Sequence, residues 1–358
     1  MASELGKHLK ITIFGESHGT AIGVTIDGLP AGEAINTDAV MELMERRMGG
    51  KRFSTARKEA DQPRFLSGFL DGRTTGSPLC AVIENTNVRS KDYSALMGKP
   101  RPSHADYPAW VKYGGFADAR GGGHFSGRLT APLCVAGAIC KQMLARRGIF
   151  VGAHIESIAD VRERRYDPVG VTAEDLAVSA ARAFPTLDEA AGEAMQAEIA
   201  AAAAEKDSVG GVVECAIVGL PVGLGEPLYD GVENRISSAI FGLGAVRGIE
   251  FGDGFAAATM RASQHNDPYC IENGAVRTKT NRHGGVLGGI TSGMPVIFRV
   301  AFKPTPSIAR EQQTVDLATM TETTITVEGR HDPCIVPRAV PCVEAIAAIV
   351  AMDLLLEK

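Results

Sequence analysis

The chain has 358 residues, of which 45% are apolar and 22% are charged. Both shares lie near the average for globular proteins, which argues against a disordered chain. The 37 basic and 42 acidic residues give a formal net charge of −5, so the chain lacks the cationic excess that binding to a nucleic-acid backbone favours.

The first part of the chain predicts strands around a single helix. Four runs are apolar or alternate between apolar and polar residues, as strands do. They lie at 9–14, 22–27, 65–69 and 79–85, and a glycine-bounded turn at 15–19 joins the first two. Between the second and third runs, Thr37 precedes a helix whose apolar residues recur on one face. These residues are Val40, Leu43, Met44 and Met48.

The middle of the chain predicts three helices. Residues 130–147 carry Pro132 in the first turn and Gly148 just past the end, the asymmetry that helices prefer. An extended stretch follows at 149–161. Two further helices open on a capping pair, in which a hydroxyl and an acidic side chain lie three residues apart. The pairs are Thr172 with Asp175 and Thr186 with Glu189, and the second pair opens an alanine-rich helix that we expect at the surface.

The last part of the chain predicts three strands and two helices. The strand-like runs lie at 211–220, 296–302 and 324–327, and the helical ones at 230–241 and 339–356. The final helix contains Pro341 near its start, and Glu344 and Asp353 interrupt its apolar run. We therefore expect a buried core helix rather than a membrane span. The strands do not alternate strictly with helices, which favours an α+β fold. No break in composition divides the chain, so we expect one domain over residues 1–358.

The sequence favours a cytoplasmic protein without a metal ion. The first residues lack the apolar core of a secretory signal. The seven cysteines are odd in number and form no C-x-x-C pair, which is typical of a reduced compartment. Among the eight histidines no H-E-x-x-H or H-x-H spacing occurs, so we expect no metal site. We expect neither a membrane nor a nucleic acid as a partner.

Glycine is the unusual residue of this chain. Average usage of about 7% would give roughly 25 glycines, but the chain has 41 and they follow no Gly-X-Y period. Many lie in or beside seven segments that carry polar residues: GESHG (15–19), RPSHAD (101–106), DARGGGHFSGR (118–128), GLGEPLYD (223–230), GGVLGGITSG (284–293), KPTPS (303–307) and GRHDPC (329–334).

These segments combine three kinds of chemistry. Glycine lets backbone N–H groups approach an anion closely. Arginine binds phosphate or carboxylate oxygens with a planar fork of donors. Histidine and aspartate exchange protons near neutral pH. The segments therefore predict acid–base work on a phosphorylated, anionic small molecule, whereas neither a Rossmann nor a P-loop glycine spacing is present.

In this order, the seven segments resemble the motif set of the chorismate synthases, and the resemblance covers essentially the whole chain. It implies a β-α-β sandwich fold and a homotetramer. It also implies the conversion of 5-enolpyruvylshikimate 3-phosphate to chorismate and phosphate, a 1,4-anti elimination that requires reduced FMN without net redox change. No added domain is present that could serve as a flavin reductase, so we expect an external flavin reductase to supply the reduced FMN.

The resemblance implies three catalytic residues. His18 matches the histidine that protonates or stabilises the reduced flavin, and His104 matches the one that protonates the leaving phosphate. Asp332 matches the aspartate that works with flavin N5 to remove the proton from C6. Outside the family, the same residues would be a turn histidine, a loop histidine beside prolines and an Asp-Pro turn starter.

The resemblance also implies a cationic substrate pocket. The substrate carries two carboxylates and a phosphate, which several arginines could hold and orient. The matching residues are Ser17, Arg46, Arg52, Arg101, Ser126, Arg128 and Arg330. For Arg46 and Arg52 the ligand stays open between the substrate and a nicotinamide nucleotide (NADP). The ordinary interpretation of these two arginines is a solvated helix end.

For FMN, the resemblance points to backbone-rich segments near Lys303, whose cation suits a phosphate. The matching residues are His124, Phe125, Ser126, Gly244, Ala245, Gly288, Lys303, Pro304, Thr305, Pro306, Ser307 and Arg330. Gly244 and Gly288 could equally serve tight turns.

Two departures from the family pattern stand out. Ser103 replaces a glycine that many members have, and it would be strained if that position needs a positive φ. His124 and Phe125 replace an Arg-Ser pair beside the expected flavin, which puts those two contacts in doubt.

Two other functions remain open on the sequence. The altered flavin segment would also suit a flavin-dependent oxidoreductase built on the same scaffold. A non-catalytic protein that binds FMN or a phosphorylated sugar is the third hypothesis. The retention of His18, His104 and Asp332 favours the lyase.

Overall fold

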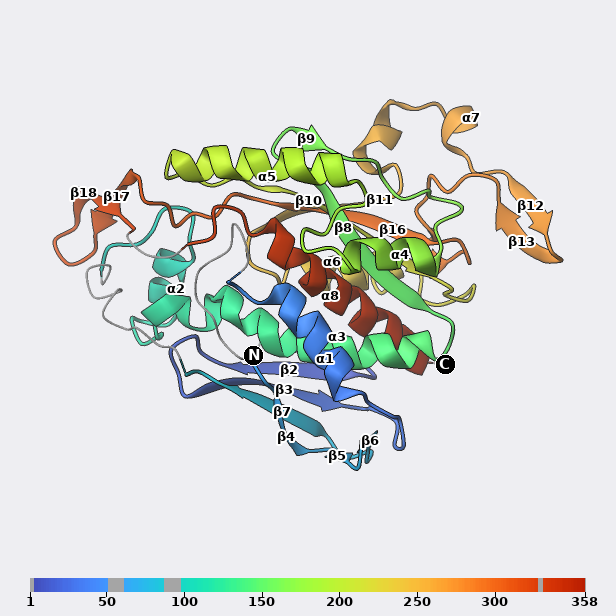
Figure 1. The fold of residues 1–358 in the computed structure, drawn as a ribbon, viewed down its shortest axis with the longest axis horizontal. Coiled ribbons are helices and arrows are strands. Elements are labelled where there is room, and N and C mark those ends of the chain that lie inside the picture. Colours follow the sequence, from blue (N-terminus) through green and yellow to red (C-terminus); the bar gives the residue numbers. More distant parts are fainter. Residues whose placement is uncertain (1–2, 51–60, 87–97, 328–330, 358) are drawn as a thin grey trace.

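The computed structural model describes residues 3–50, 61–86, 98–327 and 331–357. Two antiparallel sheets lie on either side of a layer of helices (Figure 1). The first sheet has the strand order β1-β2-β3-β7-β4. Its strands are β1 (Glu4–Leu5), β2 (Lys10–Gly15), β3 (Ala21–Asp27), β7 (Leu79–Glu84) and β4 (Arg64–Ser67). The predicted strand pair around 15–19 is confirmed as the β2–β3 hairpin, with Lys10 opposite Asp27.

The second sheet is formed by strands from the later part of the chain, in the order β11-β16-β10-β8-β9. They are β8 (Phe150–Ile158), β9 (Val161–Arg162), β10 (Gly211–Val218), β11 (Val246–Phe251) and β16 (Val296–Phe302). Strand β16 pairs with both β10 and β11, and all pairings are antiparallel. The predicted strand 296–302 is confirmed to the residue, whereas β11 was not expected from the sequence.

Three helices fill the space between the sheets: α1 (Thr37–Arg47), α3 (Thr130–Ala145) and α8 (Val336–Leu356). Helix α3 approaches α8 so closely that a Cβ added at Gly137 would lie 2.2 Å from the Cβ of Ala345, so only glycine permits this packing. Helix α8 is long and apolar enough to cross a membrane, but 89% of its most apolar window is buried inside the protein. The predicted buried core helix is therefore confirmed, and so is the β-α-β sandwich that the resemblance implied.

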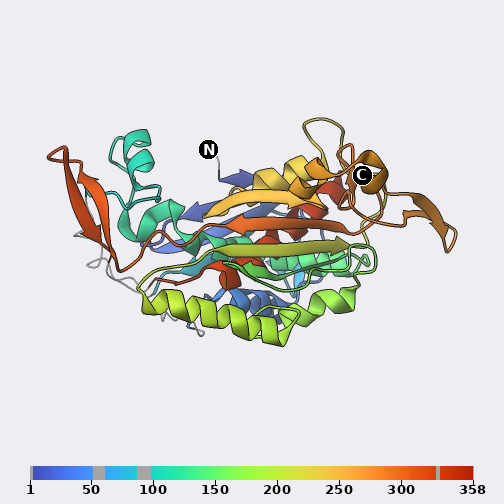
Figure 2. The same ribbon diagram turned by 90° about the horizontal axis from the view of Figure 1, so that it is seen from above.

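Two helices pack on β8 and β9 of the second sheet, α4 (Ala173–Ala180) and α5 (Glu189–Ala204), and Figure 2 shows them along one side of the molecule. The capping box of Thr172 and Asp175 at α4 is confirmed. The predicted cap Thr186 is wrong, because Asp188 accepts the Ala191 N–H and begins α5 two residues later. Helix α5 buries only Gly192, Met195 and Ile199, as a surface helix should.

The first helix also begins on a different cap from the one expected. The side chain of Asn36, not Thr37, accepts hydrogen bonds from the N–H groups of Asp38 and Ala39. The apolar spacing itself is confirmed, since Val40, Leu43 and Met44 are buried. Arg47 is buried too, because it continues the same face one turn further on.

Short elements extend the two ends of the molecule. At one end lie α2 (Asp106–Lys112) and the hairpin β17–β18, and at the other lie α7 (Ala262–His265) and the hairpin β12–β13 (Figure 1). The hairpin strands are β12 (Tyr269–Glu272), β13 (Ala275–Thr278), β17 (Glu311–Asp316) and β18 (Thr321–Thr326). The remaining helix, α6 (Val232–Ile240), packs on α8 and β11. The long strand β16 runs between the two ends.

Candidate functional site

A turn of three glycines organises the site. Gly121, Gly122 and Gly123 have φ values of +59°, +83° and +53°, a run that side chains would strain. A Cβ at Gly121 would lie 2.8 Å from Ser17 Oγ and from ring atoms of His18. Gly123 O accepts the backbone N–H of Ser17 at 3.1 Å. The missing side chains therefore let the 15–19 turn pack directly on this segment.

The same turn reaches the second histidine of the predicted site. A Cβ at Gly122 would lie 3.6 Å from Cε1 of His104 and 3.7 Å from Cβ of Ser126. His18 and Ser17 are 8% and 2% exposed. The structure thus brings both predicted catalytic histidines and both predicted substrate serines to one turn, although they come from three separate segments of the chain.

His104 binds a carboxylate, Asp106, to which the motif pattern assigned no role. Its Nδ1 lies 2.6 Å from Oδ1 of Asp106, at the start of α2. Arg101 donates to both oxygens of the same carboxylate, at 2.8 Å each. Burial opposes the effect, but the hydrogen bonds from Arg101 and His104 hold the pKa of Asp106 well below its usual range. An ionised Asp106 makes Nδ1 the donor and leaves Nε2 of His104 facing the glycine turn.

The KPTPS segment packs on the loop that carries His104. Lys303 Nζ donates to the carbonyl of Ser103 at 2.7 Å, and Arg101 Nη1 lies 3.4 Å from Ser307 Oγ. Ser103 has a φ of +57°, so the residue that replaces the family's glycine does adopt the left-handed conformation. Lys303 N–H donates to Ala245 O at 3.0 Å, which adds Gly244 and Ala245 to the same end of the molecule.

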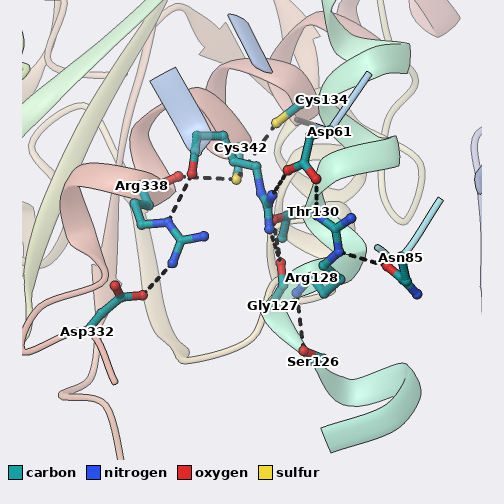
Figure 3. A network of polar contacts seen from close by, with 11 residues as sticks. Asp61, Asn85, Ser126, Gly127, Arg128, Thr130, Cys134, Asp332, Arg338 and Cys342 are labelled. Carbon is teal, nitrogen blue, oxygen red and sulfur yellow. Dashed lines mark hydrogen bonds and ion pairs between the residues drawn. The ribbon is translucent and has the colours of Figure 1, made fainter. Parts of the chain in front are cut away.

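Arg128, five residues after the glycine turn, is buried in a network of polar contacts (Figure 3). Its guanidinium binds Asp61 and, through Nε, the side-chain oxygen of Asn85 at 3.1 Å. The other carboxylate oxygen of Asp61 accepts from Arg47 Nη1 at 2.8 Å. Sequence reasoning missed Arg47 and Asp61. The spacing of the apolar face of α1 could have marked Arg47 as buried, whereas its partner depends on tertiary structure.

Asp332 lies just before α8 and binds Nη1 of Arg338 through Oδ2 at 2.5 Å. Burial and the nearby cation of Arg101 lower the pKa of the neighbouring His331. That Asp332 acts together with His18 and His104 stays a prediction.

Arg46 points elsewhere. Its guanidinium binds both oxygens of Glu344 in α8, at 2.9 and 2.6 Å, and Glu344 is fully buried. Despite burial, Arg46 and Lys141 lower the pKa of Glu344 to about 2. The solvated helix end is therefore a wrong interpretation of Arg46, and no described contact joins it to the glycine turn. Its role toward substrate or NADP stays a prediction, while Arg52 and Arg330 lie outside the described residues.

Gly288 lies at the opposite end of the molecule from Lys303. It sits in the β14–β15 hairpin (Val286–Leu287 and Ile290–Thr291), where the adjoining Gly285 packs on Val296 at the start of β16. Lys303 directly follows the last residue of β16. Seven strand residues at about 3.3 Å each separate the two sites by roughly 20 Å. The structure therefore does not bring Gly288 into the group around the glycine turn.

The two variant residues beside the turn have partners of their own. His124 Nδ1 lies 2.8 Å from Gly15 O and its Nε2 lies 2.8 Å from Ser3 Oγ, so both ring nitrogens bond within the chain. The Phe125 ring is 47% exposed and packs on Tyr113, with ring centroids 6.4 Å apart. His124 therefore fixes the turn to β2, and Phe125 leaves an aromatic surface open to a ligand.

The segment 303–307 has features that suit a phosphate ester or a flavin. Thr305 Oγ1 is buried and, among the described residues, has no hydrogen-bond partner. The Thr305 carbonyl accepts from Ser208 Oγ at 2.7 Å, which holds the backbone between Pro304 and Pro306 in place. A buried hydroxyl of this kind, two residues after Lys303, is a group that a ligand oxygen would satisfy. These residues therefore fit the cofactor that the resemblance implies.

Comparisons with known proteins agree with one another. The family model of chorismate synthase matches residues 9–356. The chorismate synthase of Thermococcus kodakarensis is 48% identical over 353 residues, which cover 99% of this chain and 97% of that protein. The chorismate synthase of Pyrococcus abyssi is 49% identical over 351 residues, with coverage of 98% and 97%. A crystal structure of chorismate synthase superposes with a TM-score of 0.77 at 28% identity and covers 98% of this chain and 93% of that one.

Proposed function

The chain belongs to the chorismate synthase family, and we propose that it carries out the family's reaction at the turn of Gly121 to Gly123. The reaction is the 1,4-anti elimination of phosphate from 5-enolpyruvylshikimate 3-phosphate, which gives chorismate. The enzyme is a carbon–oxygen lyase of the shikimate pathway and serves aromatic amino acid biosynthesis. The observation that carries the proposal is the close packing of Ser17, His18 and His104 on that turn.

His104 is proposed as the acid that protonates the leaving phosphate. The Asp106 carboxylate accepts Nδ1–H at 2.6 Å and orients the imidazole, so that Nε2 can pass a proton to a phosphate oxygen. Arg101 neutralises Asp106 and presents further N–H groups beside the same oxygen. The geometry therefore supplies both the proton and the charge that phosphate departure needs.

Asp332 is proposed as the base that removes the C6 proton. It lies just before α8, and its Oδ2 accepts a hydrogen bond from Arg338 Nη1 at 2.5 Å. Arg101, Arg128 and the hydroxyls of Ser17 and Ser126 are proposed to bind the substrate anions. We propose that these groups act on one substrate, with the acid at the glycine turn and the base just before α8.

Reduced FMN is proposed as the cofactor. When bound, it supplies electron density that eases departure of the phosphate and acidifies C6–H. The residues that fit it are Lys303, Thr305 and Ser307, with Ala245 behind Lys303 and Phe125 beside the turn. His18, 8% exposed against Gly121, is proposed to hold a proton toward the flavin. An external flavin reductase is proposed to supply the reduced cofactor in the cytoplasm.

The distant position of Gly288 supports a homo-oligomer. Because roughly 20 Å of β16 separates it from Lys303, we propose that Gly288 faces the flavin of a second copy within a homotetramer. Gly288 is exposed and a Cβ there would meet no atom of its own chain within 4 Å, so the surface is open to a partner.

The main hydrophobic core supports a single domain over the chain. It is one cluster of buried residues that includes side chains of both sheets and of the three central helices.

An anaerobic assay tests the proposed function. The enzyme is mixed with dithionite-reduced FMN and 5-enolpyruvylshikimate 3-phosphate, and the absorbance of chorismate and of oxidised flavin are followed together. We expect chorismate and phosphate in equal amounts with no net oxidation of flavin. Stoichiometric flavin oxidation would favour the oxidoreductase, and flavin binding without any product would favour the non-catalytic binding protein.

A further inference from the structure

Arg338 connects the proposed base to the end of helix α1. Its Nη1 donates to Asp332 Oδ2 at 2.5 Å, and its Nε donates to the backbone carbonyl of Arg47 at 2.9 Å (Figure 3). That carbonyl belongs to the last turn of α1, where carbonyl groups lack helical partners and a cation is favourable. One planar guanidinium therefore bonds at the same time to a catalytic carboxylate and to the main chain of a core helix.

The anchor point of Arg338 is itself immobilised. The Arg47 side chain is 4% exposed, and each of its three nitrogens donates to a different partner. The acceptors are Thr130 Oγ1 at 3.0 Å, Asp61 Oδ2 at 2.8 Å and Gly127 O at 3.1 Å. Arg47 thus ties the end of α1 to the start of α3, and its carbonyl is a fixed reference for Arg338.

Among the residues that the structure describes, the network joins three arginines to two aspartates. Arg47, Arg128 and Arg338 share Asp61 and Asp332, and burial together with the nearby Arg338 lowers the pKa of Arg47. Cys342 gives a second sign of positive potential. A hydrogen bond from Cys134, with the field of Arg47 and Arg338, lowers the pKa of its buried thiol. A guanidinium kept in such surroundings is unfavourable unless its bonds to Asp332 and to the α1 carbonyl compensate.

We propose that Arg338 is a positioning residue for proton removal: it holds the Asp332 carboxylate in place relative to the end of α1 and does not itself touch the substrate. The inference rests on the proposed role of Asp332. A guanidinium bonded both to the base and to the main chain of a core helix holds the base within the small range of positions that proton abstraction tolerates. Arg128, at the other end of the network, binds Asp61 and belongs to the anion-binding side, so the buried network sets the spacing between base and anion site.

The test compares Arg338→Met, Arg338→Lys and wild type with reduced FMN, using substrate that carries hydrogen or deuterium at C6. Methionine keeps the length and apolar stem but loses both bonds, and we expect kcat to fall roughly 100-fold, the order that a misplaced catalytic group costs. Lysine can bond Asp332 or the carbonyl but not both, so an intermediate rate is expected. The deuterium isotope effect on kcat should rise in Arg338→Met, because proton removal becomes slower than the other steps.

Three further measurements separate positioning from structure. Substrate affinity of the protein without turnover, measured by calorimetry with oxidised FMN, should stay within twofold of wild type. Adding Arg338→Met to Asp332→Asn should cause no further loss, because Arg338 acts only through Asp332. The control Arg146→Met removes an arginine that is 40% exposed and bonds Glu33 at the far end of α3, and it should leave rate and isotope effect unchanged.

The outcomes separate the positioning role of Arg338 from the proposed function. An unchanged rate or isotope effect in Arg338→Met, or additive losses in the double variant, would overturn the positioning role while chorismate formation by the wild type stands. Should Arg338→Met melt at the assay temperature, the rate and isotope effect of Arg338→Lys decide in the same way. Absence of product from the wild type would overturn the proposed function and this inference with it.

Discussion

An aspartate–histidine pair lies at each end of strand β16, and the two pairs differ in the group that the second imidazole nitrogen contacts. At the proposed site, Asp106 holds Nδ1 of His104 and Nε2 faces the glycine turn. At the opposite end, Asp267 holds Nδ1 of His283, and Nε2 lies 2.9 Å from Ser292 Oγ.

In the second pair, both Asp267 and His283 have further hydrogen-bond partners within the chain. Asp267 also accepts the N–H groups of Arg282 and His283 and the hydroxyl of Thr280. These bonds tie together the two ends of the segment that carries the β12–β13 hairpin. The comparison teaches that an Asp–His pair by itself does not mark an active site. What distinguishes His104 is an imidazole nitrogen directed at a glycine turn beside arginines, instead of at a serine of its own fold.

The largest expected difference is between the variants that neutralise Asp106 and Asp267. Asp106→Asn removes the carboxylate that orients the His104 ring, and we expect kcat to fall roughly 100- to 1,000-fold, as for other general acids that lose their orienting partner. Asp267→Asn should leave kcat within twofold and lower the melting temperature by several degrees, because a buried acceptor of several bonds is weakened. Steady-state rates and thermal melts of both variants check this, and an equal loss of rate in both would remove the distinction.

The glycine turn should be the next most sensitive feature. Gly121→Ala forces a side chain into a φ of +59° and to within 2.8 Å of Ser17 and His18. We expect a roughly 100-fold loss of activity from the displaced groups. Gly127→Ala is the matched control, since a Cβ there meets no atom within 4 Å and its φ is not positive. Similar rates for the two variants, measured anaerobically, would show that the close approach does not matter.

The Asp267–His283 pair should also affect the pH dependence of the free energy of unfolding. Although burial opposes the effect, hydrogen bonds from Thr280, Arg282 and His283 lower the pKa of Asp267 to about 2. A carboxyl with a lowered pKa stabilises the fold fully above its unfolded value, near 3.9, and this contribution is lost as the pH falls toward the folded value.

Urea unfolding at pH 5 and pH 3 measures that contribution directly. Between these two values the wild type should lose more stability than Asp267→Asn, which has no charge to lose at this position. Arg146→Met serves as a surface control and should follow the wild type. Parallel losses in wild type and Asp267→Asn would mean that the bonds to Asp267 are as strong in its protonated form.

The smallest effect is expected at Ser103, which has a φ of +57°. Ser103→Gly relieves left-handed strain of about 1–2 kcal/mol but increases the freedom of the unfolded chain by about 0.5–1 kcal/mol. We therefore expect a net gain of about 0.5 kcal/mol in the free energy of unfolding and an unchanged rate. A destabilised variant in urea titration would show that the serine side chain contributes a contact of its own.

Local sequence patterns predicted the elements that depend on local forces. The apolar run of β16 and the capping box at Thr172 were found because strand periodicity and helix capping act within a few residues. The cap of α5 was misplaced because both Thr186 and Asp188 are good capping residues, and only the chain path before the helix decides between them. The β14–β15 hairpin was missed because its strands are only two residues long and are joined by Gly288 and Gly289.

The residues of the site likewise fall into those that the sequence predicted and those that depend on tertiary contacts. The order of the glycine segments pointed to Ser17, His18 and His104, and the structure brings these residues together. It could not reveal that Arg46 binds Glu344, because the two residues are 298 positions apart and each has an ordinary helical environment. Asp106 stood inside a recognised segment, yet its bond to His104 requires the backbone turn at Ser103. Long-range ion pairs carry no local signal, and these set the positions of the catalytic groups.

The most direct test of the account is a single anaerobic assay of chorismate formation by His104→Ala and His283→Ala with reduced FMN. The account predicts a loss of about 1,000-fold in His104→Ala, the usual contribution of a general acid, and a rate within twofold of wild type in His283→Ala at a temperature where both are folded. Near-normal turnover by His104→Ala, or an equal loss in His283→Ala, would contradict the placement of the active site at the glycine turn.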